Sequence, residues 1–139
     1  MTTIREYAFG FCSSLTSVNI PDSVTYIEAY AFYSCSSLQR FSVDDQNPSY
    51  CSVDDVLFNK AMTTLIQYPA EKLDSNYSIP DSVTAIGASA FGFCSSLTSV
   101  SIPDGVTHIG SNAFSHCSSL TGVRIPSSVT YIGNYAFYG

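Results

Sequence analysis

Apolar residues recur along the chain in a fixed order that is clearest between Ile86 and Pro126. The pattern I-x-x-x-A-F-x-x-C-x-x-L-x-x-V-x-I-P occurs twice there, and the second copy starts 23 residues after the first. In its L-x-x-V-x-I part, apolar and polar side chains alternate, which is typical of a short strand with one buried face. The proline that follows lacks an amide hydrogen for strand pairing, so it predicts a turn at the end of the strand.

The remainder of each repeat predicts an outer strand followed by one helical turn. Val24 and Ile27 begin a second extended segment after the proline turn. Ala31, Phe32 and Cys35 are then three or four residues apart, a spacing that places side chains on one face of a helical turn. We therefore expect each repeat to form one coil of strand, proline turn, outer strand and helical turn.

Repetition at this period, with an L-x-x-V-x-I core, is typical of a leucine-rich-repeat solenoid. The predicted fold is an α/β repeat solenoid, a right-handed coil with a parallel concave β-sheet, short outer strands and helical turns. Residues 1–139 form a single solenoid of about six coils in this interpretation. Equivalent side chains should stack into core columns, which are predicted to contain Phe9, Phe32, Phe91, Phe114, Phe137, Cys12, Cys35, Cys94 and Cys117.

The repeat loses its spacing between residues 44 and 78. Val43 is the last residue in register, and the next matching strand residue is Ile79. We interpret 44–78 as degenerate, irregular coils with longer loops inside the same solenoid. Its charges are the densest in the chain: Asp44, Asp45, Asp54, Asp55, Glu71 and Asp74.

Neither end of the sequence contains a recognisable capping repeat. A solenoid needs a polar cap to cover its last layer. We therefore expect either a segment of a longer repeat array or end-to-end self-association through the uncapped ends.

Three units carry a more specific resemblance: IPDSVTYIEAYAFYSCSSL, IPDSVTAIGASAFGFCSSLTSV and IPDGVTHIGSNAFSHCSSLTGV. They resemble the BspA-type leucine-rich repeats, a 23-residue class also found in treponemal surface proteins. The resemblance implies a cell-surface or secreted protein that adheres to a host matrix or to other cells. It implies no catalysis and no cofactor. The first residues, MTTIREYAF, lack the basic and apolar regions of a signal peptide, so the chain is either not exported or part of a longer protein.

Composition excludes two kinds of partner. The chain has 11 acidic and 5 basic residues, a net charge of −6 and no Lys/Arg cluster. Nucleic-acid binding needs a positive patch that neutralises phosphates, so no nucleic acid is expected. No apolar run approaches the ~20 residues that span a bilayer, so no membrane insertion is expected.

Four of the five cysteines occupy one core position of the repeat, which predicts buried free thiols. Stacked strands lie ~4.8 Å apart, so a Cys12–Cys35 or Cys94–Cys117 disulfide would satisfy the distance requirement. We favour free thiols because parallel side chains in a ladder rarely point at each other.

No residue set meets the requirements of a catalytic or metal site. His116 precedes Cys117, but other repeats have Phe or Ser at that position, so the cysteine is explained without a histidine partner. The acidic pairs at 44–45 and 54–55 could offer oxygen ligands to calcium, but they lack the glycine and closing glutamate of an EF-hand. We interpret them as a solvated loop. No catalytic, cofactor-binding or metal-ligating residue is assigned.

Strand residues between the inward-facing Leu, Val and Ile should point to the concave side. The predicted partner-binding residues are small, polar and mostly uncharged: Ser17, Asn19, Arg40, Ser42, Ser99, Ser101 and Arg124. Such a face lacks a nucleophile–base pair and suits a broad contact with a protein or glycan. Further candidate anchors are the outer tyrosines Tyr7, Tyr30, Tyr33, Tyr135 and Tyr138. Two interpretations stay open, an adhesion module and a structural spacer of a longer surface array.

Overall fold

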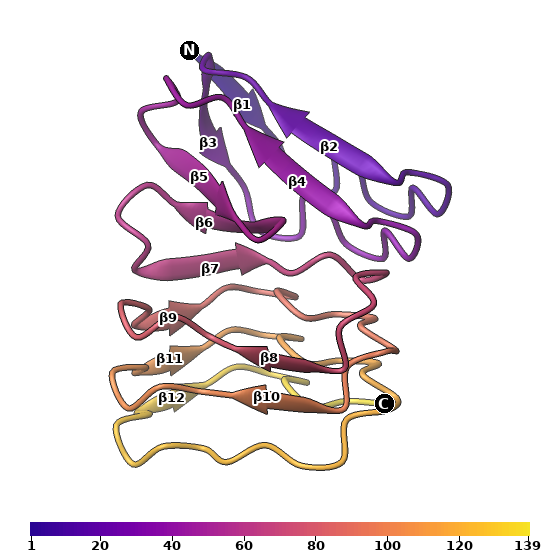
Figure 1. Cartoon of the computed structure of the whole chain (residues 1–139), viewed down its shortest axis with the longest axis vertical. Helices are drawn as coiled ribbons and strands as arrows, with labels where there is room; N and C mark the ends of the chain where they lie inside the picture. Colours follow the sequence, from indigo (N-terminus) through magenta and orange to yellow (C-terminus); the bar gives the residue numbers. More distant parts are fainter.

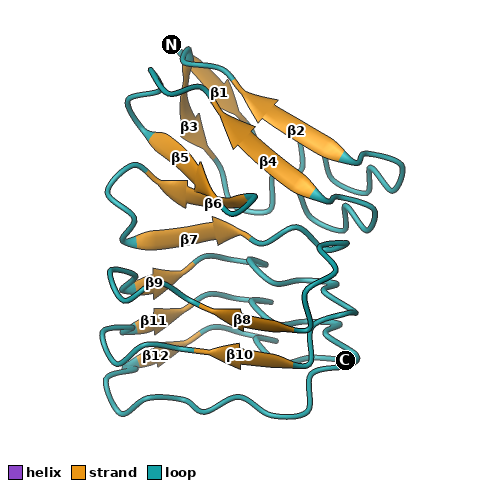
Figure 2. Cartoon of the chain, viewed as in Figure 1, coloured by secondary structure: helices purple, strands orange, loops and turns teal.

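The computed structural model describes all residues, 1–139, and contains twelve strands and no helix (Figures 1 and 2). The chain winds in successive coils that stack along one axis, so that the colours of Figure 1 follow one another from one end of the molecule to the other. The repeats of the sequence therefore become neighbours in space.

Three of the four inner strands form at the L-x-x-V-x-I position of the repeat, and the fourth, Asn76–Ser78, lies in the irregular segment. In the first of them Val18 and Ile20 are buried while Ser17 and Asn19 are exposed, as the alternation of a strand requires. Each inner strand pairs in parallel with one neighbour, the first with the second and the third with the fourth. In chain order they are β2 (Ser17–Ile20), β4 (Arg40–Val43), β8 (Asn76–Ser78) and β10 (Ser99–Ser101).

The outer strands form two further sheets. β1 pairs with β3, and the other six form one sheet in the order β12-β11-β9-β7-β6-β5. Pairing is parallel between successive regular coils and antiparallel only for β5–β6 and β6–β7. The outer strands are β1 (Thr2–Ile4), β3 (Val24–Ile27), β5 (Tyr50–Val53), β6 (Val56–Asn59), β7 (Thr64–Gln67), β9 (Ala85–Ile86), β11 (His108–Ile109) and β12 (Tyr131–Ile132).

The prediction of a helical turn in each coil is wrong, because the structure contains no helix. Between outer and inner strand the chain makes tight turns, in which the Ala90 amide donates to the Gly87 carbonyl and the Gly92 amide to the Ser89 carbonyl. Ser89 and Phe93 have φ angles of 58° and 64°. Left-handed backbone at two positions of the segment interrupts right-handed helical geometry, so no helix forms.

The irregular segment contains a β-hairpin. β5 and β6 are antiparallel and are joined by Asp54 and Asp55, whose φ angles of 51° and 67° are those that a two-residue type I′ turn requires. The Asp55 carbonyl accepts a hydrogen bond of 3.0 Å from the Phe41 amide in β4. The hairpin turn thus meets the edge of β4, and β4 and β8 do not pair (Figure 1). The predicted concave sheet is therefore divided into two.

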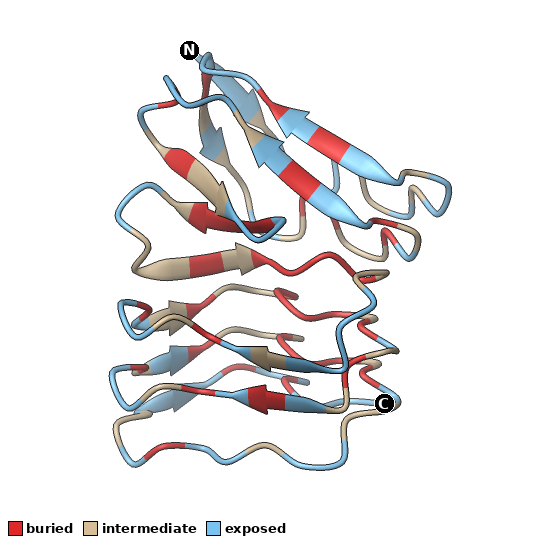
Figure 3. Ribbon diagram, viewed as in Figure 1, coloured by how far each residue is buried: buried red, intermediate tan, exposed pale blue.

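The core follows the same division. One cluster contains 10 buried residues of the N-terminal part and the other contains 19 of the remainder (Figure 3). In the first cluster the rings of Phe9 and Phe32 stack 5.4 Å apart. In the second, successive centroids lie 5.2, 4.9 and 5.2 Å apart along the ladder Tyr68, Phe91, Phe114 and Phe137.

Candidate binding surfaces

The first concave sheet carries a polar outer face. Across the β2–β4 pair, Ser17 lies opposite Arg40 and Asn19 opposite Ser42. All four side chains are exposed. The Ser42 hydroxyl donates to the Asn19 amide oxygen at 3.3 Å, so equivalent residues of adjacent coils form a hydrogen-bonded row.

The second concave sheet repeats this arrangement. Ser99 lies opposite Asn76 and donates to its amide oxygen, and Ser101 lies opposite Ser78. Asn76 and Ser78 were missed by sequence reasoning because they lie in the irregular segment, where the repeat gives no register. Arg124 lies outside any strand. Its guanidinium is 3.5 Å from the Asp104 carboxylate, and both side chains are exposed.

An ion cluster joins the hairpin turn to the coil that follows. The Lys72 ammonium lies 3.6 Å from the Asp54 carboxylate, is hydrogen-bonded to Asp74 and sits 6.0 Å from the centroid of the Tyr68 ring. Burial acts to lower the pKa of Lys72, but the two carboxylates outweigh it and the pKa is raised. Lys72 therefore stays charged and ties the hairpin to the solenoid.

The thiols of two repeated cysteines, Cys35 and Cys117, donate hydrogen bonds to the coil before. All five cysteines are free, and Cys35, Cys94 and Cys117 are buried. The Cys35 thiol donates to the Phe9 carbonyl at 3.0 Å and the Cys117 thiol to the Phe91 carbonyl at 2.9 Å. Burial raises the pKa of Cys35 to about 11. A buried thiol with a raised pKa, such as that of Cys35, is a weak nucleophile.

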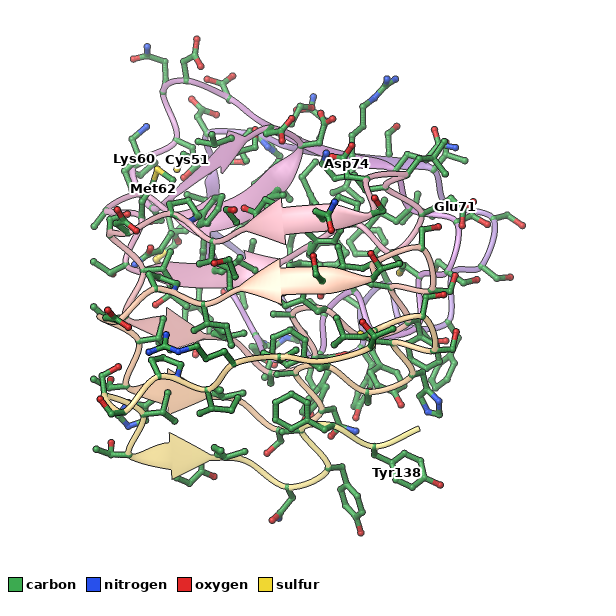
Figure 4. All side chains as sticks on the ribbon, turned by 60° about the horizontal axis from the view of Figure 1, so that its bottom comes forward. Cys51, Lys60, Met62, Glu71, Asp74 and Tyr138 are labelled. Atoms are coloured by element: carbon green, nitrogen blue, oxygen red, sulfur yellow. The ribbon has the colours of Figure 1, made fainter.

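The out-of-register cysteine, Cys51, is only partly buried and lies near Lys60 (Figure 4). Burial raises the pKa of its thiol, and the Lys60 charge offsets only part of that effect.

Neither histidine lies in a position to act as a general acid or base in catalysis. The His116 ring stacks on Phe93 at 4.7 Å, while the thiol of Cys117 is bonded to a carbonyl. His108 is exposed, and its Nδ1 lies 2.8 Å from the Thr107 hydroxyl. No three His, Cys, Asp or Glu side chains gather as a metal site would require. The structure has no helix with the length and hydrophobicity of a membrane span.

The outer tyrosines belong to a longer row of aromatic rings on the turn segments. Tyr7 stacks on Tyr30 at 5.6 Å with the rings 8° from parallel, and Tyr135 meets Tyr138 edge to face at 5.8 Å. Figure 4 shows Tyr138 at the margin of the molecule, pointing away from the ribbon. Sequence reasoning missed Phe11, Phe93 and His116, which complete the row. In the sequence each of them directly precedes a repeated cysteine and lies outside the repeat pattern, so nothing marked it as part of an aromatic row.

The C-terminal coil leaves an apolar face uncovered. A hollow of about 460 Å³ is lined by Phe114, Leu120, Val123 and Phe137 among others. Ile132, which corresponds to the buried Ile109 of the coil before, is 48% exposed. The inner surface of the last coil is therefore open to solvent.

Stacked parallel coils, two inner sheets with apolar and polar residues alternating, and a ladder of core phenylalanines define a leucine-rich-repeat solenoid. The family model described as BspA type Leucine rich repeat region (6 copies) matches residues 1–75 and 70–139. The chain belongs to this family, which confirms both the predicted repeat class and the predicted solenoid.

Solved structures of bacterial proteins have the same fold. A leucine-rich repeat protein from Eubacterium ventriosum is 33% identical, with a TM-score of 0.85 over 90% of this chain. A leucine rich cell surface protein from Faecalibacterium prausnitzii is 35% identical, with a TM-score of 0.82 over 88% of this chain. The pneumococcal vaccine antigen PcpA is 27% identical, with a TM-score of 0.82 over 86% of this chain.

The chain spans about a third of the length of these structures, 35%, 33% and 35% respectively. No curated protein sequence matches it.

Proposed function

We propose that the chain is a non-catalytic binding module of a bacterial cell-surface protein, and that its concave face contacts a protein or glycan partner. The observation that carries the proposal is the exposed polar row on each inner sheet, which is held in register by Ser42–Asn19 and Ser99–Asn76 hydrogen bonds. Side chains that are already oriented lose less conformational entropy when a partner binds.

Two similar proteins support the cell-surface assignment. The Faecalibacterium structure is described as a cell surface protein, and PcpA as a vaccine antigen. Extracellular adhesion to a host matrix or to other cells fits such a location. A chain without an assembled catalytic pair or metal cluster fits a role in contact rather than in chemistry.

Binding of the purified chain to immobilised matrix proteins and glycans tests the proposal. We expect saturable binding that weakens at least about tenfold when Arg40 and Arg124 are both replaced by alanine, since exposed arginines are frequent interface anchors. Lys60→Ala is the matched control, because Lys60 is also an exposed cation but lies on the loop after β6 and not on an inner strand. Absence of saturable binding, or equal weakening by Lys60→Ala, would overturn the proposal.

The apolar face of the last coil favours a second function, that of a structural spacer. A face with Ile132 and Phe137 half exposed is suited to a further coil or to the end of a second copy. End-to-end association would make the sedimentation coefficient rise with concentration, and Ile132→Lys should abolish that rise. Sedimentation of a single species at all concentrations would contradict self-association.

A further inference from the structure

An unbroken row of aromatic rings follows the turn segments along the solenoid axis. Six of its members have left-handed backbone, with φ between 55° and 64°: Tyr7, Phe11, Tyr30, Phe93, His116 and Tyr135. Tyr33 and Tyr138 connect them by edge-to-face contacts of 5.5–5.9 Å. We call these eight residues the aromatic stripe.

The left-handed backbone conformation in the aromatic stripe is energetically unfavourable for the residues that adopt it. A left-handed conformation costs a bulky residue roughly 1–2 kcal/mol, and only glycine, asparagine or aspartate adopt it readily. The remaining residues at these two positions of the repeat are Ser34, Ser89, Asn112 and Gly139, and they have the same left-handed backbone. The backbone is thus common to the repeat, and the aromatic rings at six of its positions are not what backbone geometry alone would select.

The short irregular coil makes the aromatic stripe continuous. Beyond Tyr68 that coil has no outward turn of the regular kind, and Tyr33 from the coil before meets Phe93 from the coil after at 5.5 Å. A pocket of about 190 Å³ lies beside the stripe and is lined by residues of three coils, among them Glu28, Tyr30 and Ile66. This volume is below the ~300 Å³ of small-molecule sites and suits a single inserted side chain.

The main chain of the aromatic stripe offers few free donors to an added strand, because five of its eight amides are hydrogen-bonded within the chain. The Phe11 amide donates to the Tyr33 carbonyl, the Phe93 amide to Ser115 and the His116 amide to Tyr138. A ligand that pairs as a β-strand would find these groups occupied. A ligand held by side-chain rings and tyrosine hydroxyls would not need them.

The geometry points to a basic, proline-rich segment in the polyproline II conformation as the ligand of the aromatic stripe. Perpendicular rings such as Tyr33–Phe93 at 86° and His116–Tyr138 at 89° form corners that receive proline rings. Polyproline II repeats every three residues at 3.1 Å each, about 9.3 Å, which matches two coils at ~4.8 Å. The stacked pair Phe93–His116 separates the two corners, so one ligand would meet both of them.

The negative charge of the chain favours a basic ligand of this kind over a neutral or acidic one. The chain has a net charge of −6. Two of its carboxylates, Glu6 and Glu28, lie beside Tyr7 and Tyr30, and Glu28 also lines the small pocket. Arg5 lies 4.0 Å from the Glu28 carboxylate, so an arginine or lysine of the ligand would share Glu28 with Arg5 and also meet the exposed Glu6 carboxylate. The site is separate from the concave face, so it can fail without affecting the function proposed above.

Titration of the whole chain with peptides of repeated Arg-Pro-Pro triplets tests the inference. Tyrosine fluorescence is a direct reporter, because the chain has no tryptophan. We expect saturable binding of this peptide, and at least about tenfold weaker binding of Arg-Gly-Gly and Glu-Pro-Pro peptides of equal length. Equal binding of the Arg-Gly-Gly peptide would reduce the interaction to charge alone and overturn the inference.

Two variants separate the aromatic stripe from general stability. Phe93→Asn places the best non-glycine residue in the left-handed backbone, so we expect an unfolding midpoint close to that of the unmodified chain and at least about tenfold weaker peptide binding. Tyr131→Ala is the control, since Tyr131 is 53% exposed on β12 and lies off the stripe. Unchanged peptide binding by a folded Phe93→Asn chain overturns the inference. So does binding of glycans or of a second copy at the stripe in place of the peptide.

Discussion

The rings of Phe91 and Phe114 lie 4.9 Å apart and only 5° from parallel. They are separated by 23 residues in the sequence and by one coil in space. Each coil thus buries its phenylalanine against the ring of the next, and neither coil can exclude water from this column without its neighbour. The stability of the solenoid is accordingly distributed over coil interfaces rather than concentrated in one centre.

Replacement of Phe91 by alanine removes a ring that is fully buried between Tyr68 and Phe114. We expect it to lower the free energy of unfolding by ~3–5 kcal/mol, through lost burial and the cavity that remains. Phe137→Ala is the control, because Phe137 stacks on one neighbour only and is 46% exposed. Its cost should be below about half of the Phe91 value. Urea unfolding measures both, and equal costs would contradict the ladder.

Asn47 is a buried polar residue that braces two coils. Its side-chain amide donates to the carbonyls of Pro21 and Val24 at 2.8 and 2.9 Å, and its oxygen accepts the amides of Ser49 and Tyr50, both at 2.8 Å. Asn47→Ala would leave these buried groups without partners, so we expect a loss of about 2–4 kcal/mol in urea unfolding.

The matched control for Asn47 is Asn19→Ala. Asn19 is exposed on β2, so its replacement should change stability by no more than about 0.5 kcal/mol. A neutral Asn47→Ala would show that water replaces the amide in the coil interface.

The strands of the regular coils could be predicted because the alternation of apolar and polar residues indicates both where a strand lies and which face it buries. In β10 the valine is buried and the two serines around it are exposed, and β2 shows the same alternation with Ser17 and Asn19 exposed. The turn segments were not predictable, since the spacing of Ala90, Phe91 and Cys94 fits a helix while the left-handed backbone of Phe93 prevents one. Serine and phenylalanine, which stand at Ser89 and Phe93, give no sequence signal of positive φ.

Two features of the irregular coil could not be predicted from the sequence, each for a physical reason. Asp54–Asp55 turns a hairpin without the Asn-Gly or Asp-Gly pair that usually signals a type I′ turn. Tyr68 takes the place of a ladder phenylalanine without the cysteine three residues later that marks the others. On the concave face this left Asn76 unassigned, although it pairs with the predicted Ser99.

Alkaline pH should destabilise the fold through Cys35. Burial raises the pKa of this thiol from 9.0 to about 11. Between these values the unfolded chain releases the proton while the folded chain keeps it, so the free energy of unfolding falls as pH rises. The stabilising contribution is complete below pH 9 and is lost by about pH 11. We expect urea unfolding of Cys35→Ala to show a smaller decline over this window than the unmodified chain. Parallel declines would mean that Cys35 is not protected from ionisation.

Gly110 and Gly122 test how closely the coils approach each other. A Cβ atom at Gly110 would lie 2.6 Å from the backbone nitrogen of Ala88 in the coil before, whereas one at Gly122 would meet nothing within 4 Å. Gly110→Ala must therefore separate two backbones, and we expect it to cost about 1–3 kcal/mol. Gly122→Ala only reduces the freedom of the unfolded chain, and it should stabilise by about 0.4–1 kcal/mol.

The pair of glycine variants isolates backbone approach from composition, because both make the same chemical change. Neither glycine has a positive φ, so conformational strain does not enter the comparison. Unfolding in urea should move the midpoint of Gly110→Ala downward and that of Gly122→Ala upward. If both moved in the same direction, the close contact of Gly110 with Ala88 would not be what holds glycine at this position of the repeat. Arg5 and Glu28, which occupy that position in the first two coils, would then be the better guide to what the fold tolerates there.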